Sequence, residues 1–365
     1  MGKTSELLAP LDPNALLLAL IKSMSSKGIK ELLARLPIVG ENEYAYDTSK
    51  PEVGWKEGLL HWYPVGADRG NAGRIKLAGS PENPIAERII NAIESLIELQ
   101  RHCELRINLG ASLPVGPREA VKRYFDLPPL DEIPGSKSLI GGMKASEYAR
   151  GIAKRVRVKL VRETRPVEYT VLVEDDGIGQ LPERIHATIL SLGKSDKPDK
   201  PYLIGVFGQG GSSAYAASEF SWVISRRAPE LLDKDCNAVG WTIIKHVYPV
   251  GRRDDFWAYL AAHPDGRVPT LPVLAADRVG FKQGTWIAHV NYNFGRTEPA
   301  RTLYQSLNHL LFNPVLPYEL YTRPAPERPD PMWGNAYRLS RLGSNKKALD
   351  KKFEPQPVGK KLEGG

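Results

Sequence analysis

The chain has 365 residues, enough for one large domain or two modest ones, and its 42% hydrophobic and 25% charged residues are ordinary for a globular protein. Its longest strongly apolar stretch, residues 15–21, is far too short to span a bilayer, and no secretory-signal pattern opens the sequence, so no membrane is expected. Cys103 and Cys236 form no paired motif, which excludes a disulfide scaffold and fits a reducing cytoplasm. Of the net charge of +8, residues 323–365 carry +5, with ten Lys and Arg against five Asp and Glu. This basic tail suggests a DNA partner, and a solvated end is the alternative.

The first 45 residues are predicted to form helices that break near Gly28. Apolar residues recur there at helical spacing, namely Leu16, Leu17, Leu20, Ile21, Ile29, Leu32, Leu33 and Leu36. The leucine stripe of Leu16, Leu20 and Leu32 either packs on its own domain or offers an apolar surface to a second subunit. Two short strands are expected next, at 59–63 and 74–77, around a polar glycine-rich turn.

A well-marked helix is predicted from Ser80 or Asn83, as N-cap, to about Gln100, with Pro84 in its first turn. The proline-rich residues 101–150 are expected to be an irregular insertion. Strands are predicted at 155–161, 168–173, 220–225, 241–248 and 285–291, with a short helix near 183–192 and another starting near Ser212. This mixture of helices and antiparallel strands indicates an α+β protein, built as a two-layer α/β sandwich.

Four polar residues share one face of the predicted helix: Glu87, Asn91, Glu94 and Glu98. An ordinary amphipathic helix has the same pattern. A carboxylate and a carboxamide one turn apart can also divide the work at a phosphate site. Glu87 would orient and deprotonate a water molecule, and the oxygen of Asn91 would bind Mg²⁺.

The segment VLVEDDGIGQLP, residues 171–182, ends a predicted buried strand in Asp175 and continues with Gly177 and Gly179. It is either a simple Asp-Gly turn or a place where a carboxylate accepts a hydrogen bond from a ligand amino group. Glycine would then remove the Cβ atoms that block the approach of a flat ligand.

A glycine-rich segment at 205–211 precedes the predicted helix that begins near Ser212. Backbone amides there can form an anion-binding nest, and the lysines at 194, 197 and 200 can cover a polyphosphate as part of a mobile lid, residues 192–209. No Gly-Lys-Ser/Thr ends the segment, so it is not a P-loop. Further on, Thr285 follows Gly284 at the start of a strand.

Together and in this order, the four segments resemble the GHKL ATPases, the superfamily of gyrase, heat-shock chaperones, histidine kinases and MutL. The matching residues are Glu87 and Asn91, then Asp175, Gly177 and Gly179, then Phe207, Gly208 and Gly210, then Gly284 and Thr285. The resemblance implies a Bergerat fold that binds ATP and Mg²⁺. It makes Glu87 the general base, Asn91 the magnesium ligand, and Asp175 and Thr285 the adenine readers. The expected nucleotide-binding residues are Asn91, Asp175, Gly177, Gly179, Lys194, Phe207, Gly208, Gln209, Gly210, Gly211, Ser212, Ser213 and Thr285.

Within the superfamily, the sequence IGVFGQGGSSA is most similar to heat-shock chaperones, MORC ATPases and topoisomerase VI. The expected organisation is an N-terminal helical arm at 1–50, the ATP-binding domain at 51–295, and a C-terminal extension at 296–365. That extension is short for the transducer domain that usually supplies a catalytic lysine. Either the chain is a fragment or a partner supplies that group.

The resulting hypothesis is a slow cytoplasmic ATPase in which nucleotide closes the lid and drives dimerisation or the binding of a separate partner protein. A DNA-directed process, such as repair, remodelling or phage defence, is the preferred setting. The alternatives are a chaperone-like ATPase acting on a polypeptide client and a nucleotide sensor with little hydrolysis.

Overall fold

The computed structural model describes residues 12–39, 55–134, 139–164, 166–193, 199–204, 210–232, 237–248, 255–295, 298–323 and 328–343. Its α-helices are α1 Pro13–Lys22, α2 Ser26–Leu33, α3 Glu82–Ile107, α4 Pro117–Phe125, α5 Ala145–Ala153, α6 Pro182–Ile185, α7 Ser213–Ala216, α8 Val273–Arg278, α9 Pro299–Leu310 and α10 Gly334–Gly343. Its strands are β1 His61–Pro64, β2 Leu139–Ile140, β3 Met143–Lys144, β4 Val156–Thr164, β5 Val167–Asp175, β6 Phe220–Arg226, β7 Ala238–Val247, β8 Phe256–Ala261, β9 Thr270–Pro272, β10 Gly284–Val290, β11 Tyr318–Tyr321 and β12 Asp330–Met332.

Ten of the described strands form one sheet in the order β1-β8-β7-β6-β10-β5-β4-β11-β12, with β9 paired to β7 outside this path. β11 lies parallel to β4, and the other strand pairs in the described part of the chain are antiparallel. The prediction of a mixed α and β protein with a mostly antiparallel sheet is therefore confirmed. The five strands predicted between residues 155 and 291 correspond to β4, β5, β6, β7 and β10.

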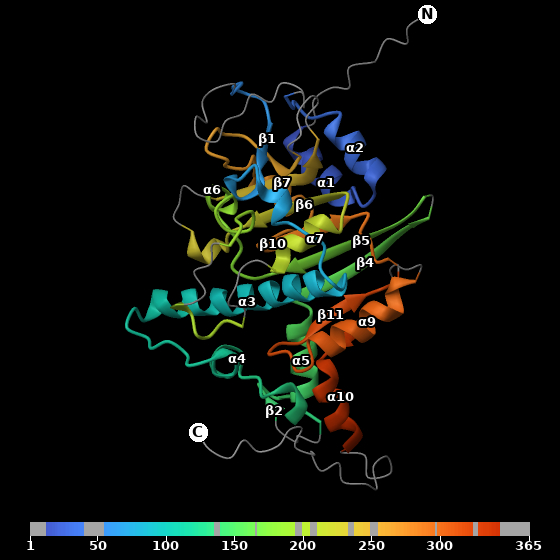
Figure 1. Ribbon diagram of the computed structural model, residues 1–365. Helices are drawn as coiled ribbons and strands as arrows, with labels where there is room; N and C mark the ends of the chain where they lie inside the picture. The colour runs from blue at the N-terminus through green and yellow to red at the C-terminus, as the bar shows by residue number, and fades with distance from the viewer. Residues whose placement is uncertain are drawn as a thin grey trace, which may run out of the picture.

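Different helices cover the two faces of the sheet (Figure 1). Asp175 at the end of β5 accepts a hydrogen bond from Ser95 of α3, so this face carries α3. Trp222 of β6 faces the other way, because its indole nitrogen donates to the carbonyl of Ser23, between α1 and α2 (3.4 Å). Thr170 of β5 bonds the neighbouring carbonyl of Met24 (2.8 Å). The N-terminal helices thus add a partial third layer to the expected two-layer arrangement.

The leucine stripe is buried in the core of its own chain, since Leu16, Leu20 and Leu32 are at most 7% exposed. The packing interpretation of the N-terminal helices is therefore confirmed. The break between them lies at residues 23–25, not at Gly28. The hydroxyl of Ser25 accepts a hydrogen bond from the amide of Gly28 and so places this glycine in the first turn of α2.

The strand predicted at 74–77 is wrong. A 3-10 turn, Asn71–Gly73, precedes these residues, and the side chain of Asn71 is fully buried. It donates to the carbonyl of Val65 (3.0 Å) and exchanges two hydrogen bonds with the backbone of Trp257 (2.8 Å each). One asparagine side chain thus satisfies backbone groups of Val65 and of Trp257 in β8.

The central helix α3 runs to Ile107, well beyond the predicted end near Gln100. Its N-cap is Pro81 without a side-chain hydrogen bond, so neither predicted capping residue acts as a cap. The additional turns are mostly polar, and apolar residues do not recur in them at helical spacing, so the sequence pattern did not predict them. Arg101 stabilises them by bonding Glu104 of the same helix and the carbonyls of Ala111 and Ser112.

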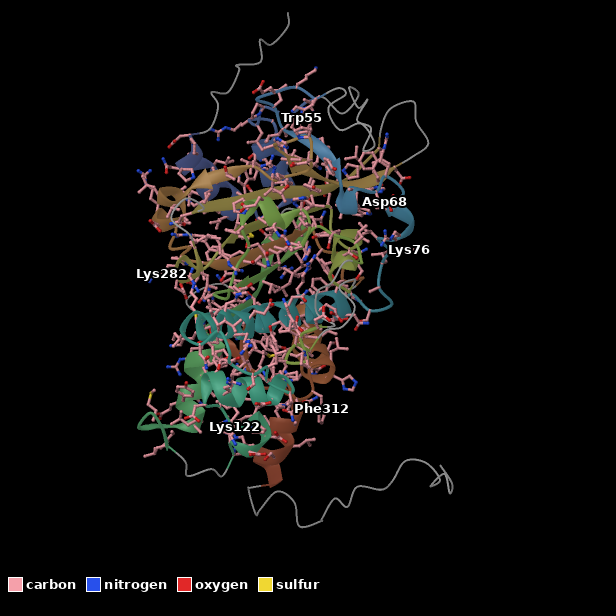
Figure 2. All side chains as sticks on the ribbon, turned by 90° about the vertical axis from the view of Figure 1, so that its left-hand side faces the viewer. Trp55, Asp68, Lys76, Lys122, Lys282 and Phe312 are labelled. Atoms are coloured by element: carbon pink, nitrogen blue, oxygen red, sulfur yellow. The ribbon has the colours of Figure 1, made fainter. Side chains whose placement is uncertain are left out.

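Regular structure continues through residues 101–150, which were expected to be an irregular insertion, and through the C-terminal region. Residues 101–150 contain α4, α5 and the small β2–β3 sheet, and the C-terminal region adds β11, β12, α9 and α10. Figure 1 shows α9 and α10 below β11, and Met332 and Trp333 are buried in the main core. In Figure 2, Lys122 of α4 and Phe312 lie at the end of the molecule away from Trp55.

None of the described helices is long and apolar enough to cross a membrane.

Candidate functional site

A cavity of about 850 Å³ lies between α3 and the sheet, within the size range of small-molecule sites. One wall is α3, and the floor is the end of β5 with the start of β10. The described residues that line it are Arg88, Asn91, Ala92, Glu94, Ser95, Glu98, His102, Val173, Asp175, Ile178, Gln180, Leu181, Arg184, Ala187, Thr188, Ile189, Ser191, Lys200, Gly211, Ser212, Arg227, Thr285 and Ile287.

The carboxyl group of Asp175 lies on the floor of the cavity and is 5% exposed. Its Oδ1 accepts hydrogen bonds from the hydroxyl of Ser95 (3.0 Å) and from the amide of Gly177 (2.9 Å). Burial raises the pKa of Asp175 to about 7, although these hydrogen bonds act in the opposite direction. The group is therefore a hydrogen-bonding carboxyl whose charge is costly until a ligand donates to it.

The two glycines after Asp175 allow close backbone packing. A Cβ atom on Gly177 would lie 2.2 Å from the hydroxyl of Ser95, and one on Gly179 would lie 1.8 Å from the carbonyl of Arg226. Gly179 also has a φ of +59°, which favours glycine. These contacts are with the protein itself, so the glycines position α3 and β6 around Asp175 and do not simply clear space for a ligand.

Thr285 lies directly opposite Asp175 in the pairing of β10 with β5, so both side chains are on the cavity face. Its hydroxyl is 2.8 Å from that of Ser225 on β6. Ser225 donates to the carbonyl of Gly284 (3.1 Å) and accepts from the amide of Gln180 (2.9 Å). Three strands and the loop after β5 thus hold Asp175 and Thr285 as one polar group.

The α3 wall carries Asn91, Glu94 and Glu98, as the helical spacing predicted. Glu94 is 2% exposed and accepts from the amide of Ile204 (2.7 Å), and Glu98 pairs with Lys200 (2.6 Å). Residues 199–204 of the expected lid are thus bound to α3. Tyr202 and Leu203 are also buried, so this part of the predicted mobile lid is packed against the protein.

The remaining predicted site residues fall into three groups. Gly211 and Ser212 line the cavity, and Gly210 lies in the same 3-10 turn, Gly210–Ser212. Ser213 begins α7 behind that turn, and α7 has only four residues, so it contributes little helix dipole. Lys194, Phe207, Gly208 and Gln209 lie outside the described residues.

Glu87 is half-buried on α3, one turn before Asn91, and is not among the described residues that line the cavity. Its assignment as a general base stays a prediction. The described residues also contain no group of three or more His, Cys, Asp or Glu side chains suited to a metal ion. A magnesium ion at Asn91 would need ligand oxygens from phosphates and water, as Mg²⁺ commonly has.

Ser95 and Arg88 are two of the cavity residues that were not predicted from the sequence. Ser95 lies one helical turn after Asn91, so the spacing that selected Asn91 also points to it. Arg88 follows Glu87 directly and resembles an ordinary surface arginine in the sequence, yet it is 8% exposed and lines the cavity. The spacing of apolar residues along α3 does not indicate that Arg88 is buried.

A scan of the chain against known protein families gave no match, and a search of curated proteins gave no match either.

Asp175→Asn should stabilise the ligand-free protein more at pH 8 than at pH 5. The pKa of Asp175, about 7, is above the usual 3.8, so the folded state binds the proton more tightly and loses stability as pH rises through this window. The amide of Asp175→Asn does not titrate, so the variant does not lose stability in this way. At about 1.4 kcal/mol per pKa unit, the increase in the free energy of unfolding from wild type to Asp175→Asn should be larger at pH 8 than at pH 5 by roughly 1–3 kcal/mol.

Denaturant unfolding at both pH values measures this difference. Asp126→Asn is the control, because Asp126 is exposed and left-handed, a conformation that asparagine also tolerates. A gain of the same size at pH 5 and pH 8 would show that Asp175 is not a buried, titrating carboxyl.

Proposed function

We propose that the chain binds ATP in this cavity and hydrolyses it slowly, with nucleotide acting as a conformational switch of the GHKL type. The observation that carries the proposal is the buried carboxyl of Asp175, held by Ser95 and Gly177 on the floor of a cavity of about 850 Å³. A carboxyl buried in a cavity suits a ligand that brings its own N–H group.

Adenine meets that requirement through its exocyclic amino group. The carboxylate of Asp175 would accept from it, and the hydroxyl of Thr285 is on the same face to contact the neighbouring edge of the base. Val173, Ile178 and Ile287 supply apolar surface for the ring. This combination of a few polar groups with apolar walls supports a heteroaromatic base as the ligand.

The phosphates would extend along α3 toward Asn91, Gly211 and Ser212, which line the cavity beyond Ser95. Asn91 is the residue that would hold Mg²⁺, which supplies charge neutralisation to the phosphates when bound. Glu87, one turn farther along the helix, would orient the attacking water and accept its proton.

The switch is proposed to lie in the segment between α6 and α7. Its residues 199–204 already contact α3 through Lys200 and Ile204. A ligand that displaces either α3 or this segment would therefore also change the position of the other. Because the leucine stripe is buried in its own core, it does not supply a dimer surface. A nucleotide-dependent dimer or partner would have to use another surface.

Glu87→Ala should separate binding from hydrolysis. If Glu87 is the base, phosphate release should fall by roughly 10²–10⁴-fold while ATP affinity changes little. Phosphate release and calorimetric ATP titration are the two measurements, with Glu147→Ala, an exposed substitution on α5, as the control. Equal phosphate release by wild type and Glu87→Ala would remove Glu87 from the mechanism. ATP binding without phosphate release by wild type would leave a nucleotide sensor.

A DNA-directed role is proposed from the charge of the C-terminal tail. Residues 344–365 lie outside the described residues and contain six lysines, at 346, 347, 351, 352, 360 and 361. Replacing these lysines by glutamine should weaken DNA binding and flatten its dependence on salt, because fewer phosphates are neutralised. The substitutions leave β12 and α10 in place. An unchanged slope of log affinity against log salt would show that the tail does not bind DNA.

A further inference from the structure

Arg88 is a buried cation at the end of the cavity opposite His102. Its side chain is packed over the ring of Tyr215, 5.1 Å from the guanidinium carbon to the ring centre. A Cβ atom on Gly211 would lie only 2.8 Å from its Nη1, so the missing side chain at Gly211 makes room for it. The arginine is 8% exposed and lines the cavity.

The charge of Arg88 is not neutralised within the described part of the chain. Its Nε and Nη2 atoms are buried and make no hydrogen bond, and no described carboxylate forms an ion pair with it. His289 is fully buried nearby, and burial together with Arg88 holds its pKa well below the usual value, so it is neutral. A buried charge without a partner is costly.

We infer that Arg88 binds the polyphosphate of the nucleotide, an inference that rests on the proposed function. Arg88 and Ser95 are about 10 Å apart along α3, at about 1.5 Å per residue. A base held at Asp175 and Ser95 therefore places its phosphates near Arg88. The planar guanidinium can donate two parallel hydrogen bonds to phosphate oxygens, and its Nε and Nη2 have no hydrogen-bond acceptor in the described part of the chain.

The test is calorimetric titration of the full chain with ATP, ADP and adenosine. Arg88→Gln and Arg88→Met are compared with wild type and with Arg150→Gln, an exposed arginine on α5, as the control. ATP affinity should fall roughly 10–100-fold in both Arg88 variants, because a charge-assisted contact is lost, while adenosine affinity should stay within about twofold. The loss of ADP affinity should be no larger than the loss of ATP affinity.

The thermal midpoint of each ligand-free variant separates a binding role from a structural one. Since no described carboxylate pairs with the charge of Arg88, Arg88→Met should melt no lower than wild type, and ATP should raise its melting temperature less. If Arg88→Met fails to fold, Arg88→Gln still gives the affinity comparison. Equal ATP affinity in wild type and Arg88→Gln, or equal losses for all three ligands, overturns the inference alone. Wild-type protein that binds none of the three ligands overturns the proposed function and this inference with it.

Discussion

The burial of the Asp175 carboxyl is the constraint on which the arrangement of the cavity depends. Its hydrogen bonds from Ser95 and Gly177 join the end of β5 to the middle of α3, and a side chain at Gly177 would separate them. The cavity wall is therefore fixed by the same contacts that hold the carboxyl out of water. Burial raises the pKa of Asp175 to about 7, so this geometry is maintained at a cost in stability that a donating ligand can remove.

Arg88, on α3, adds a buried cation to the cavity whose floor holds the buried carboxyl of Asp175. The carboxyl of Asp175 can accept a hydrogen bond from a ligand, and the guanidinium of Arg88 can bind an anion. A ligand with a donating base at one end and an anionic chain at the other satisfies both groups at once. Binding of such a ligand would stabilise the fold as well as fill the cavity, because it pairs two groups that are costly without it.

Burial alone does not separate the strands that were predicted from those that were not. β4, which alternates in burial, and β6, which is buried along its whole length, were both predicted, whereas the equally buried β8 was not. The turn at Asn71–Gly73 was not predicted in detail, because the bonding of the Asn71 side chain to the backbone of Val65 and Trp257 depends on tertiary contacts that no periodicity encodes. In the site, Asp175 and Asn91 followed from spacing. Arg88 did not, because its burial depends on the distant Gly211 and Tyr215.

Calorimetric titration of wild type and Asp175→Asn with ATP and Mg²⁺ tests the central claim most directly. The account predicts saturable ATP binding by wild type and a loss of at least about 100-fold in Asp175→Asn, because the amide replaces a charge-assisted acceptor by a weaker one. The variant must be shown to be folded by its melting transition under the same conditions. Equal ATP affinity in the two folded proteins would contradict the assignment of Asp175 to an adenine site.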